Sequence, residues 1–199
     1  MNNKYKQYSE TNFPERLFVL GASPSLELLY PYREEMNEWG HWAIIHPPVT
    51  RAFLEYINPL YLISYTRCGL QDKAYAEICL NNPLGNVTYG ASIGGFISQF
   101  EKFGGKELFL FGYQGGVPSG YWRDQPLDTG VTECPAIYTN GGDARVGMNP
   151  EKHLIDCDNM NKDFATRYTG WRSLKLYHLG KTRYNFMTKV STKELMELI

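Results

Sequence analysis

Short apolar runs recur along this chain and are separated by stretches in which apolar residues follow helical spacing. Such runs predict strands that are covered on both faces. Strands that alternate with helices favour right-handed βαβ units. We therefore expect an α/β fold: a Rossmann-like, doubly wound, mostly parallel sheet with helices on both faces. The expected strands span residues 17–20, 42–45, 60–65, 107–112 and 174–179.

The first strand leads into a turn of small residues, Gly21-Ala22-Ser23-Pro24-Ser25. Ser23 or Ser25 can cap a helix that we expect from about Ser25 to Trp39, interrupted near Pro31. Backbone N–H groups converge in such a turn, and a phosphate can bind there. The turn matches neither the G-x-G-x-x-G nor the P-loop pattern, and a plain tight βα turn is an equally supported alternative.

Further elements follow from local patterns. Phe96, Ile97, Phe100 and Phe103 have helical spacing, and Gly104-Gly105 ends the helix that they predict. Ser191 to Glu194 form a capping box that opens a C-terminal helix. The other expected elements are helices at about 50–57, 71–80 and 150–169, and a short strand at 86–89.

Between Tyr113 and about Pro150 the apolar residues follow neither the spacing of a strand nor that of a helix. A segment of this length is typical of lids and binding loops, and its aromatic residues favour that interpretation over a disordered insert. We expect one domain, 1–199, with residues 113–150 as an active-site loop or lid. Parallel sheets bind ligands outside the carboxyl ends of their strands. The loops at those ends carry Ser23, His46, Thr66, Ser92 and Tyr113.

Acidic and basic residues are balanced, with 20 Lys and Arg against 21 Asp and Glu and a formal charge of −1. This balance gives no support to nucleic-acid binding. The polar N-terminus lacks the core of a secretion signal and no apolar run has the length of a membrane span, so we expect a cytoplasmic protein. Scattered cysteines without a C-x-x-C pair predict free thiols rather than a zinc or redox site. They are Cys68, Cys79, Cys134 and Cys157.

Three segments together resemble a known group of enzymes. Leu20-Gly21-Ala22-Ser23-Pro24-Ser25-Leu26 is similar to the G-x-G-P-S-L opening of the bacterial sialyltransferases of glycosyltransferase family 42, and of the domain shared by motility accessory factors and archaeal 6-hydroxymethylpterin diphosphokinases. Residues 87–95 and 103–113 resemble their S-G-x-x-x-x-x-A-x-x-x-G-x-K-E-I-Y-L-x-G-x-D block. His153, the helix after it and residues 175–179 are similar to the end of the sialyltransferases.

The resemblance implies a nucleotide site. The phosphate would contact the first turn, and the ribose and base would lie against residues that follow the second and third strands. The implied phosphate contacts are Gly21, Ala22, Ser23 and Ser25, with Ser92 and Gly94 beside them. The other implied nucleotide contacts are His46, Thr66, Tyr113 and Gln114.

The resemblance also implies a catalytic base, His153, in the loop before the penultimate helix. A helix-capping or solvent-facing role for this histidine is an equal alternative. Of the other histidines, we expect His178 to pack inside the last strand and His41 to lie at the surface. The lid would supply contacts to the acceptor and the leaving phosphate through Tyr121, Asp124, Tyr138 and Arg145.

Two positions depart from the family pattern. Ala22-Ser23 stands where the family has Asn-Gly or Gly-Gly, which removes backbone freedom near the phosphate. Gln114 stands where the family has Asp, and a neutral amide is a poor ligand for Mg²⁺ and cannot act as a base. Loop carboxylates that could substitute, or that simply form turns, are Asp124, Asp128 and Asp143.

The sequence favours a nucleotide-sugar-dependent glycosyltransferase with a CMP-sugar donor, a hydroxyl acceptor, a histidine base and no required metal. The first alternative is pyrophosphoryl transfer to a pterin from ATP and Mg²⁺, against which Gln114 counts. The second is a nucleotide- or sugar-binding module without catalysis, because a fold alone does not determine activity. An oligomer is compatible with all three.

Overall fold

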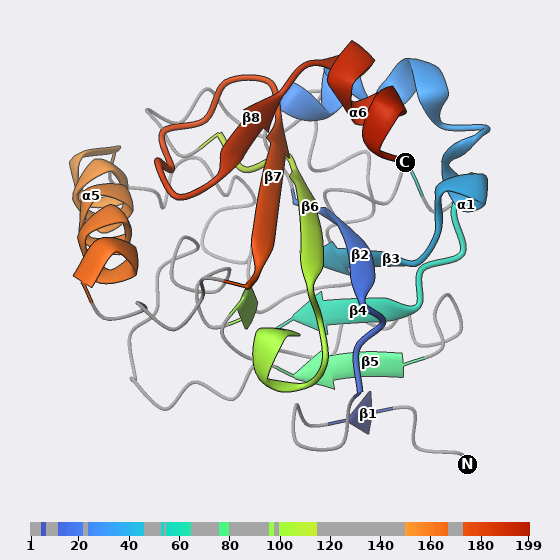
Figure 1. The fold of residues 1–199 in the computed structure, drawn as a ribbon, viewed down its shortest axis with the longest axis horizontal. Helices are drawn as coiled ribbons and strands as arrows, with labels where there is room; N and C mark the ends of the chain where they lie inside the picture. The colour runs from blue at the N-terminus through green and yellow to red at the C-terminus, as the bar shows by residue number, and fades with distance from the viewer. Residues whose placement is uncertain are drawn as a thin grey trace, which may run out of the picture.

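The computed structural model describes residues 5–6, 12–21, 24–45, 53, 55–64, 76–79, 96–97, 100–114, 150–166 and 173–199. Within them, eight strands form one sheet in the order β1-β5-β4-β3-β2-β6-β7-β8, and each neighbouring pair is parallel (Figure 1). The fold is therefore α/β. The strands are β1 Tyr5–Lys6, β2 Arg16–Leu20, β3 Trp42–Ile45, β4 Tyr61–Ser64, β5 Ala76–Cys79, β6 Glu107–Phe111, β7 Lys175–Leu179 and β8 Thr188–Val190.

The order of the strands reverses at β2. From β2 the chain adds β3, β4 and β5 on one side, and then returns to add β6, β7 and β8 on the other. Leu20, near the end of β2, is paired with Ile44 on β3 and with Phe111 on β6. The expected strands at 17–20, 42–45, 60–65, 107–112 and 174–179 are confirmed by β2, β3, β4, β6 and β7.

Alternate residues of β2 enter two separate cores. Leu17 and Val19 face a cluster that includes Cys157 and Met160 of α5, Pro150–Thr166, and we call this side the α5 face. Phe18 and Leu20 face the opposite side, the α1 face. The α1 face is covered by the 3₁₀ segments η2, Pro24–Leu28, and η3, Tyr30–Tyr32, and by helices α1, Met36–Trp39, and α6, Thr192–Leu198.

The helix expected from Ser25 to Trp39 does end at Trp39 and is interrupted near Pro31, but its long helical stretches are wrong, because η2, η3 and the short α1 take their place. Pro31 has no N–H to continue a helical ladder, and the bonds on either side of it run from Leu29 N to Leu26 O and from Tyr32 N to Leu29 O. Burial of Leu26, Leu29 and Met36 against the sheet stabilises this broken path instead.

The expected helix at 71–80 is wrong at its C-terminal end, where Ala76–Cys79 form β5. β5 pairs with β4 on one side and β1 on the other. The sequence analysis also missed β1 and β8, which are short edge strands of two and three residues. Ala and Glu favour helices locally, and pairing with a neighbouring strand outweighs that preference.

Helix ends follow local chemistry closely. Residues 100–102 are helical, and the N–H groups of Gly104 and Gly105 donate to the carbonyls of Glu101 and Phe100. This is a Schellman ending, with Gly104 at a φ of +103°. At the start of α6, Ser191 and Glu194 form the expected capping box. Within the described part of the chain, no helix is long and apolar enough to span a membrane.

Candidate functional site

The C-terminal ends of β2 and β6 bring Gly21 against the turn Gly112-Tyr113-Gln114. The Gly21 N–H donates to the carbonyl oxygen of Phe111 at 2.7 Å. A Cβ atom at position 21 would lie 2.8 Å from the Gly112 oxygen and 2.8 Å from the Tyr113 ring. Gly112 itself has a φ of +77°, which side chains rarely adopt. Glycine at both positions permits this close approach of two loops.

Gln114 connects the turn to the segment after β2. Its Oε1 accepts a hydrogen bond from the Ser25 N–H at 3.2 Å. The sequence analysis predicted that Ser25, Tyr113 and Gln114 share one site with Gly21, and the structure brings all four together. The Ser25 N–H, predicted to meet a phosphate, is bonded here to a neutral side-chain oxygen. Because η2 is a short 3₁₀ segment, the site has no long helix dipole behind this amide.

His178 holds the same turn from β7. The N–H of Tyr113 donates to His178 Nε2 at 3.1 Å, and His178 Nδ1 lies 3.4 Å from the carbonyl oxygen of Gly180. The side chain is fully buried. The pKa of His178 is lowered to about 4, mainly by burial and also by the charge of Lys189, although the bond to Gly180 opposes both. The expected burial of His178 is confirmed, whereas its hydrogen bond to the Tyr113 N–H was not predicted.

The connection between β7 and β8 supplies further contacts to the turn. Thr182 Oγ1 donates to the carbonyl oxygen of Tyr113 at 2.8 Å, and the Arg183 N–H donates to that of Gln114 at 2.7 Å. Thr182 also lies 3.3 Å from the Gln114 oxygen. Neither residue was predicted, because no local motif marks them and their partners lie about seventy residues earlier in the chain.

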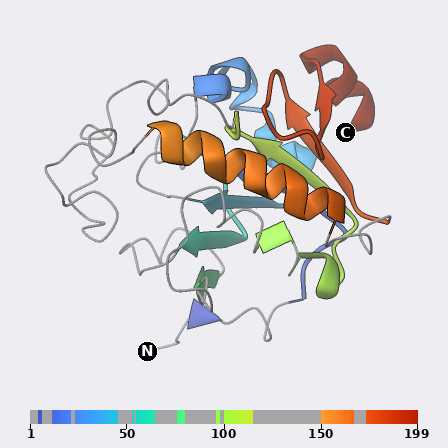
Figure 2. The same ribbon diagram turned by 90° about the vertical axis from the view of Figure 1, so that its left-hand side faces the viewer.

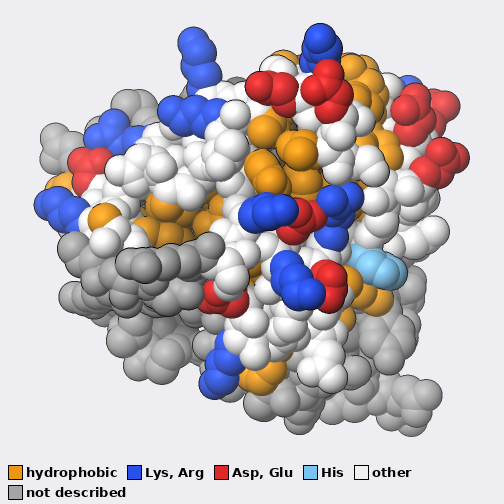
Figure 3. Space-filling model, in the orientation of Figure 1, with side chains coloured by type: hydrophobic (Ala, Val, Ile, Leu, Met, Phe, Trp, Pro, Cys, Tyr) orange, Lys and Arg blue, Asp and Glu red, His pale blue; other side chains and the backbone are white. Residues whose placement is uncertain are grey.

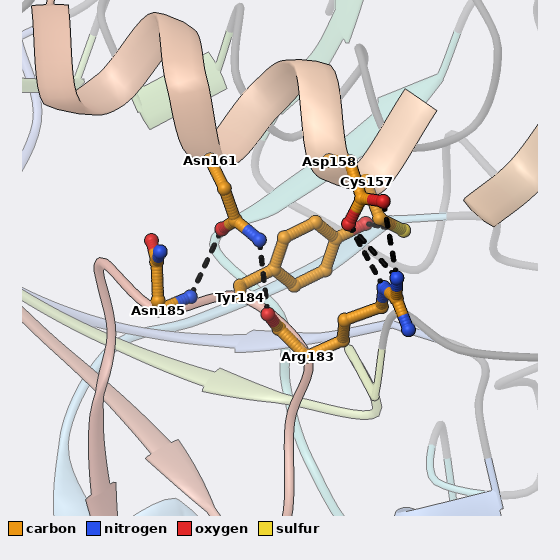
Figure 4. Close-up of polar contacts among 6 residues, drawn as sticks. All are labelled: Cys157, Asp158, Asn161, Arg183, Tyr184 and Asn185. Atoms are coloured by element: carbon orange, nitrogen blue, oxygen red, sulfur yellow. Dashed lines mark hydrogen bonds and ion pairs between the residues drawn. The ribbon is translucent and has the colours of Figure 1, made fainter. Parts of the chain in front are cut away.

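The same connection binds α5 (Figure 4). Arg183 forms a two-pronged ion pair with Asp158, with nitrogen-to-oxygen distances of 2.9 Å and 3.1 Å. Asn161 donates to the carbonyl oxygen of Arg183 at 3.1 Å and accepts the N–H of Asn185 at 2.9 Å. Cys157 is a buried free thiol, as expected, whose sulfur lies 3.5 Å from the Tyr184 hydroxyl. Arg183 therefore joins α5 to the turn after β6.

The expected helix at about 150–169 is confirmed by α5, but the loop position that the resemblance implies for His153 is wrong, because His153 lies within the first turn of that helix. Pro150 begins that helix, because a proline at the first position lacks only an N–H that would have no helical partner. Figure 2 shows α5 running opposite to β3 and β4, so it begins on the side to which those strands point. His41 is exposed, as expected.

Many predicted site residues lie outside the described residues. They are Ala22, Ser23, His46, Thr66, Ser92 and Gly94 of the nucleotide set, Tyr121, Asp124, Tyr138 and Arg145 of the lid set, and the alternative carboxylates Asp128 and Asp143. Residues 115–149 of the expected lid also lie outside the described residues.

Charged side chains of both signs lie interspersed on the face of the molecule that Figure 3 draws. Glu107 illustrates this mixture: it contacts both Lys175 and Arg16, and these bonds lower the pKa of its carboxyl group. Among the described residues, no group of three or more His, Cys, Asp or Glu side chains is arranged to hold a metal ion.

The functional assignment rests on the geometry of the site, because comparison with known proteins gives no match. No protein-family model, no curated protein and no solved structure matches the chain.

Proposed function

We propose that this protein is a nucleotide-sugar-dependent glycosyltransferase built on a Rossmann-like, doubly wound sheet, and that its donor nucleotide binds at the C-terminal edge between β2 and β6. The observation that carries the proposal is the reversal of strand order at β2. In open parallel sheets, ligands bind where the order reverses, outside the carboxyl ends of the strands.

The contact between Gly21 and the Gly112–Gln114 turn supports this location. Two glycine-led loops leave adjacent strands at the reversal point and approach closely. Glycines without a Cβ let a ligand approach the main chain of such loops closely. Ser25 and Gln114 lie at the same edge and supply polar groups beside them.

The proposed reaction transfers a sugar from a CMP-linked donor to a hydroxyl acceptor. His153 is the proposed base that removes the acceptor proton, and the start of α5 on the strand-end side of the sheet is compatible with this role (Figure 2). In the proposal, residues 113–150 cover the bound donor. Tyr121, Asp124, Tyr138 and Arg145 then contact the acceptor and the leaving phosphate.

Gln114 favours a reaction without a metal at its position. A neutral amide is a weak ligand for Mg²⁺, and its Oε1 already accepts a bond from Ser25. This counts against the alternative of ATP- and Mg²⁺-dependent pyrophosphoryl transfer. We therefore expect cytidine nucleotides to bind in the absence of divalent cations.

A thermal-shift panel of CMP, CDP, CTP, UDP, GDP and ATP, each with and without Mg²⁺, tests the proposal. A ligand at about 100 times its Kd adds roughly 2.7 kcal/mol of stability, so specific binding is readily seen. We expect stabilisation by cytidine nucleotides without metal, followed by turnover of a CMP-sugar. A response to ATP with Mg²⁺ alone would favour the diphosphokinase alternative. Binding without turnover would indicate a non-catalytic module, and no response at all would contradict nucleotide binding.

Matched variants locate the site and the base. Gly21→Ala should abolish the response to CMP, because the added Cβ meets the turn after β6. Gly104→Ala, at a position of positive φ where an added Cβ would lie in ordinary contact with the Phe13 oxygen at 3.5 Å, should lower stability but keep that response. His153→Ala should lower turnover with CMP binding unchanged, and His41→Ala should change neither. Equal loss of binding in the His153 variant would contradict its assignment as the base.

A further inference from the structure

The Tyr113 peptide is held from both sides by residues of the last third of the chain. Its N–H donates to His178 Nε2 at 3.1 Å, and its carbonyl oxygen accepts from Thr182 Oγ1 at 2.8 Å. The same turn contacts Gly21 through the Tyr113 ring and Ser25 through Gln114. The turn at the candidate site is thus bonded to both His178 and Thr182.

The geometry determines the protonation state of the ring. A backbone N–H always donates, so the nitrogen that faces it must carry a lone pair. His178 Nε2 is therefore unprotonated, and the ring proton of the neutral form lies on Nδ1, which faces the Gly180 carbonyl at 3.4 Å. A proton added to the ring would go to Nε2, where it would point at the Tyr113 N–H.

We propose that His178 is a positioning residue for the candidate site: its neutral ring holds the Tyr113 backbone, and protonation of Nε2 removes the acceptor and releases the Gly112–Gln114 turn. The bond to the turn stands on the geometry alone, whereas its effect on nucleotide affinity rests on the proposed function.

The surroundings of the ring favour the neutral state. On β8, Lys189 is the register partner of His178, and its positive charge disfavours a second one nearby. On β6, the register partner is the apolar Leu110. The titratable side chain of the turn is the Tyr113 phenol, whose ring lies against Gly21. Burial and the charge of Lys189 keep the pKa of His178 near 4, so the ring is neutral at pH 7.

Nuclear magnetic resonance of ¹⁵N-labelled protein tests the bond directly. At pH 7 we expect His178 Nε2 to show the chemical shift of an unprotonated ring nitrogen. On acidification, the Nε2 shift and the Tyr113 amide shift should change together, with a midpoint near pH 4. Protonated Nε2 at pH 7, or a Tyr113 amide that ignores the titration of His178, would overturn the proposal.

Two variants separate positioning from simple packing. His178→Gln places an amide oxygen near the position of Nε2 and does not titrate, whereas His178→Leu fills the space without an acceptor. We expect Tyr113 amide exchange to be about tenfold faster in the Leu variant, the loss expected for one buried hydrogen bond, and to be restored in the Gln variant. The Gln variant should also lose the acid transition of the Tyr113 amide. Equal exchange in all three proteins would overturn the role, with His41→Gln as the unaffected control.

Affinity for CMP provides the functional measurement. His178→Leu should weaken CMP binding by about tenfold, and His178→Gln should restore it, since one hydrogen bond positions the turn. Faster Tyr113 exchange with unchanged CMP affinity would overturn the positioning role. If none of the proteins binds CMP, the proposed function fails, while the resonance measurements still decide whether His178 holds the turn. If His178→Leu does not fold, the wild-type titration decides it.

Discussion

The two faces of the sheet are built from the same strands but covered in different ways. Central-strand residues that point to the α5 face are mainly aliphatic, and they are covered by α5, a helix of 17 residues, together with the helical residues Phe96, Ile97 and Phe100. Those that point to the α1 face are mainly aromatic, and short 3₁₀ and helical segments cover them. The aliphatic set is Leu17, Val19, Leu108, Leu110 and Leu176, and the aromatic set is Phe18, Trp42, Phe109, Phe111 and Tyr177.

The aromatic set forms a continuous group of rings. Phe18 lies 5.0 Å from Trp42 and 4.9 Å from Phe109 between ring centroids, and Phe109 lies 4.7 Å from Tyr177. Large rings bury much apolar area, so short covering segments are sufficient on this face.

The α5 face differs in a second way, because polar contacts join its covering helix to the candidate site. α5 is bonded to the 182–185 segment, and that segment is bonded to Gln114 and Tyr113. The difference teaches that the strand residues of the α1 face are joined mainly by ring packing, whereas the α5 face also carries the polar contacts that hold the site. Four predictions test this comparison.

The largest expected effect is at Phe18. Phe18→Ala removes a fully buried ring from the centre of the aromatic group and should lower the free energy of unfolding by about 3–5 kcal/mol. Val19→Ala, the next residue on the opposite face, should cost about 2 kcal/mol for two buried carbons. Chemical denaturation measures both. Equal losses would contradict the difference between the two faces.

The second effect is the pH dependence that His178 contributes. Between pH 6.5 and about 4 the unfolded chain binds a proton that the folded ring excludes, so stability falls as the pH falls. The slope is about 1.4 kcal/mol per pH unit, or roughly 3 kcal/mol in total. Urea denaturation of the wild type and His178→Gln over this range measures it. The wild type should lose more stability on acidification, and parallel profiles would refute this prediction.

A smaller effect is expected at the start of α6, on the α1 face. Ser191 accepts the Glu194 N–H, and Glu194 accepts the Ser191 N–H, so Ser191→Ala removes half of a capping box. The loss should be about 1 kcal/mol, measured by thermal or urea denaturation. Lys193→Ala, in the same helix and largely exposed, is the control. A loss no larger than that of the control would show that the cap contributes little here.

The smallest effect on stability is expected on the α5 face. Asp158→Asn weakens the ion pair with Arg183, and because both side chains are about half exposed the cost should be below about 1 kcal/mol. The Gln114 and Tyr113 amide resonances should nevertheless shift, because Arg183 is bonded to Gln114. The exposed Asn159→Gln is the control. A stability loss as large as that of Phe18→Ala, or unchanged turn resonances, would break the distinction between the faces.

Part of the candidate site could be predicted from the sequence. The apolar run to Leu20 and the glycine after it placed Gly21 at a strand end, and the second glycine, Gly112, marked the end of β6. Parallel pairing then implied that Gly21, Tyr113 and Gln114 lie at one edge, which the structure bears out. The roles of Thr182 and Arg183 could not be predicted, because their partners are separated from them by about seventy residues.

The sequence by itself determined the features that depend on a few neighbouring residues. Apolar runs set the central strands, Gly104 set a helix end through its positive φ, and Ser191 set a helix start through its side-chain bond. Tertiary structure alone decided that Ala76–Cys79 form a strand and that the segment after β2 is not one long helix. It also decided that His178 binds the Tyr113 backbone. Pairing and burial involve partners far apart in the chain, and their free energies exceed the weak local preferences for helix or strand.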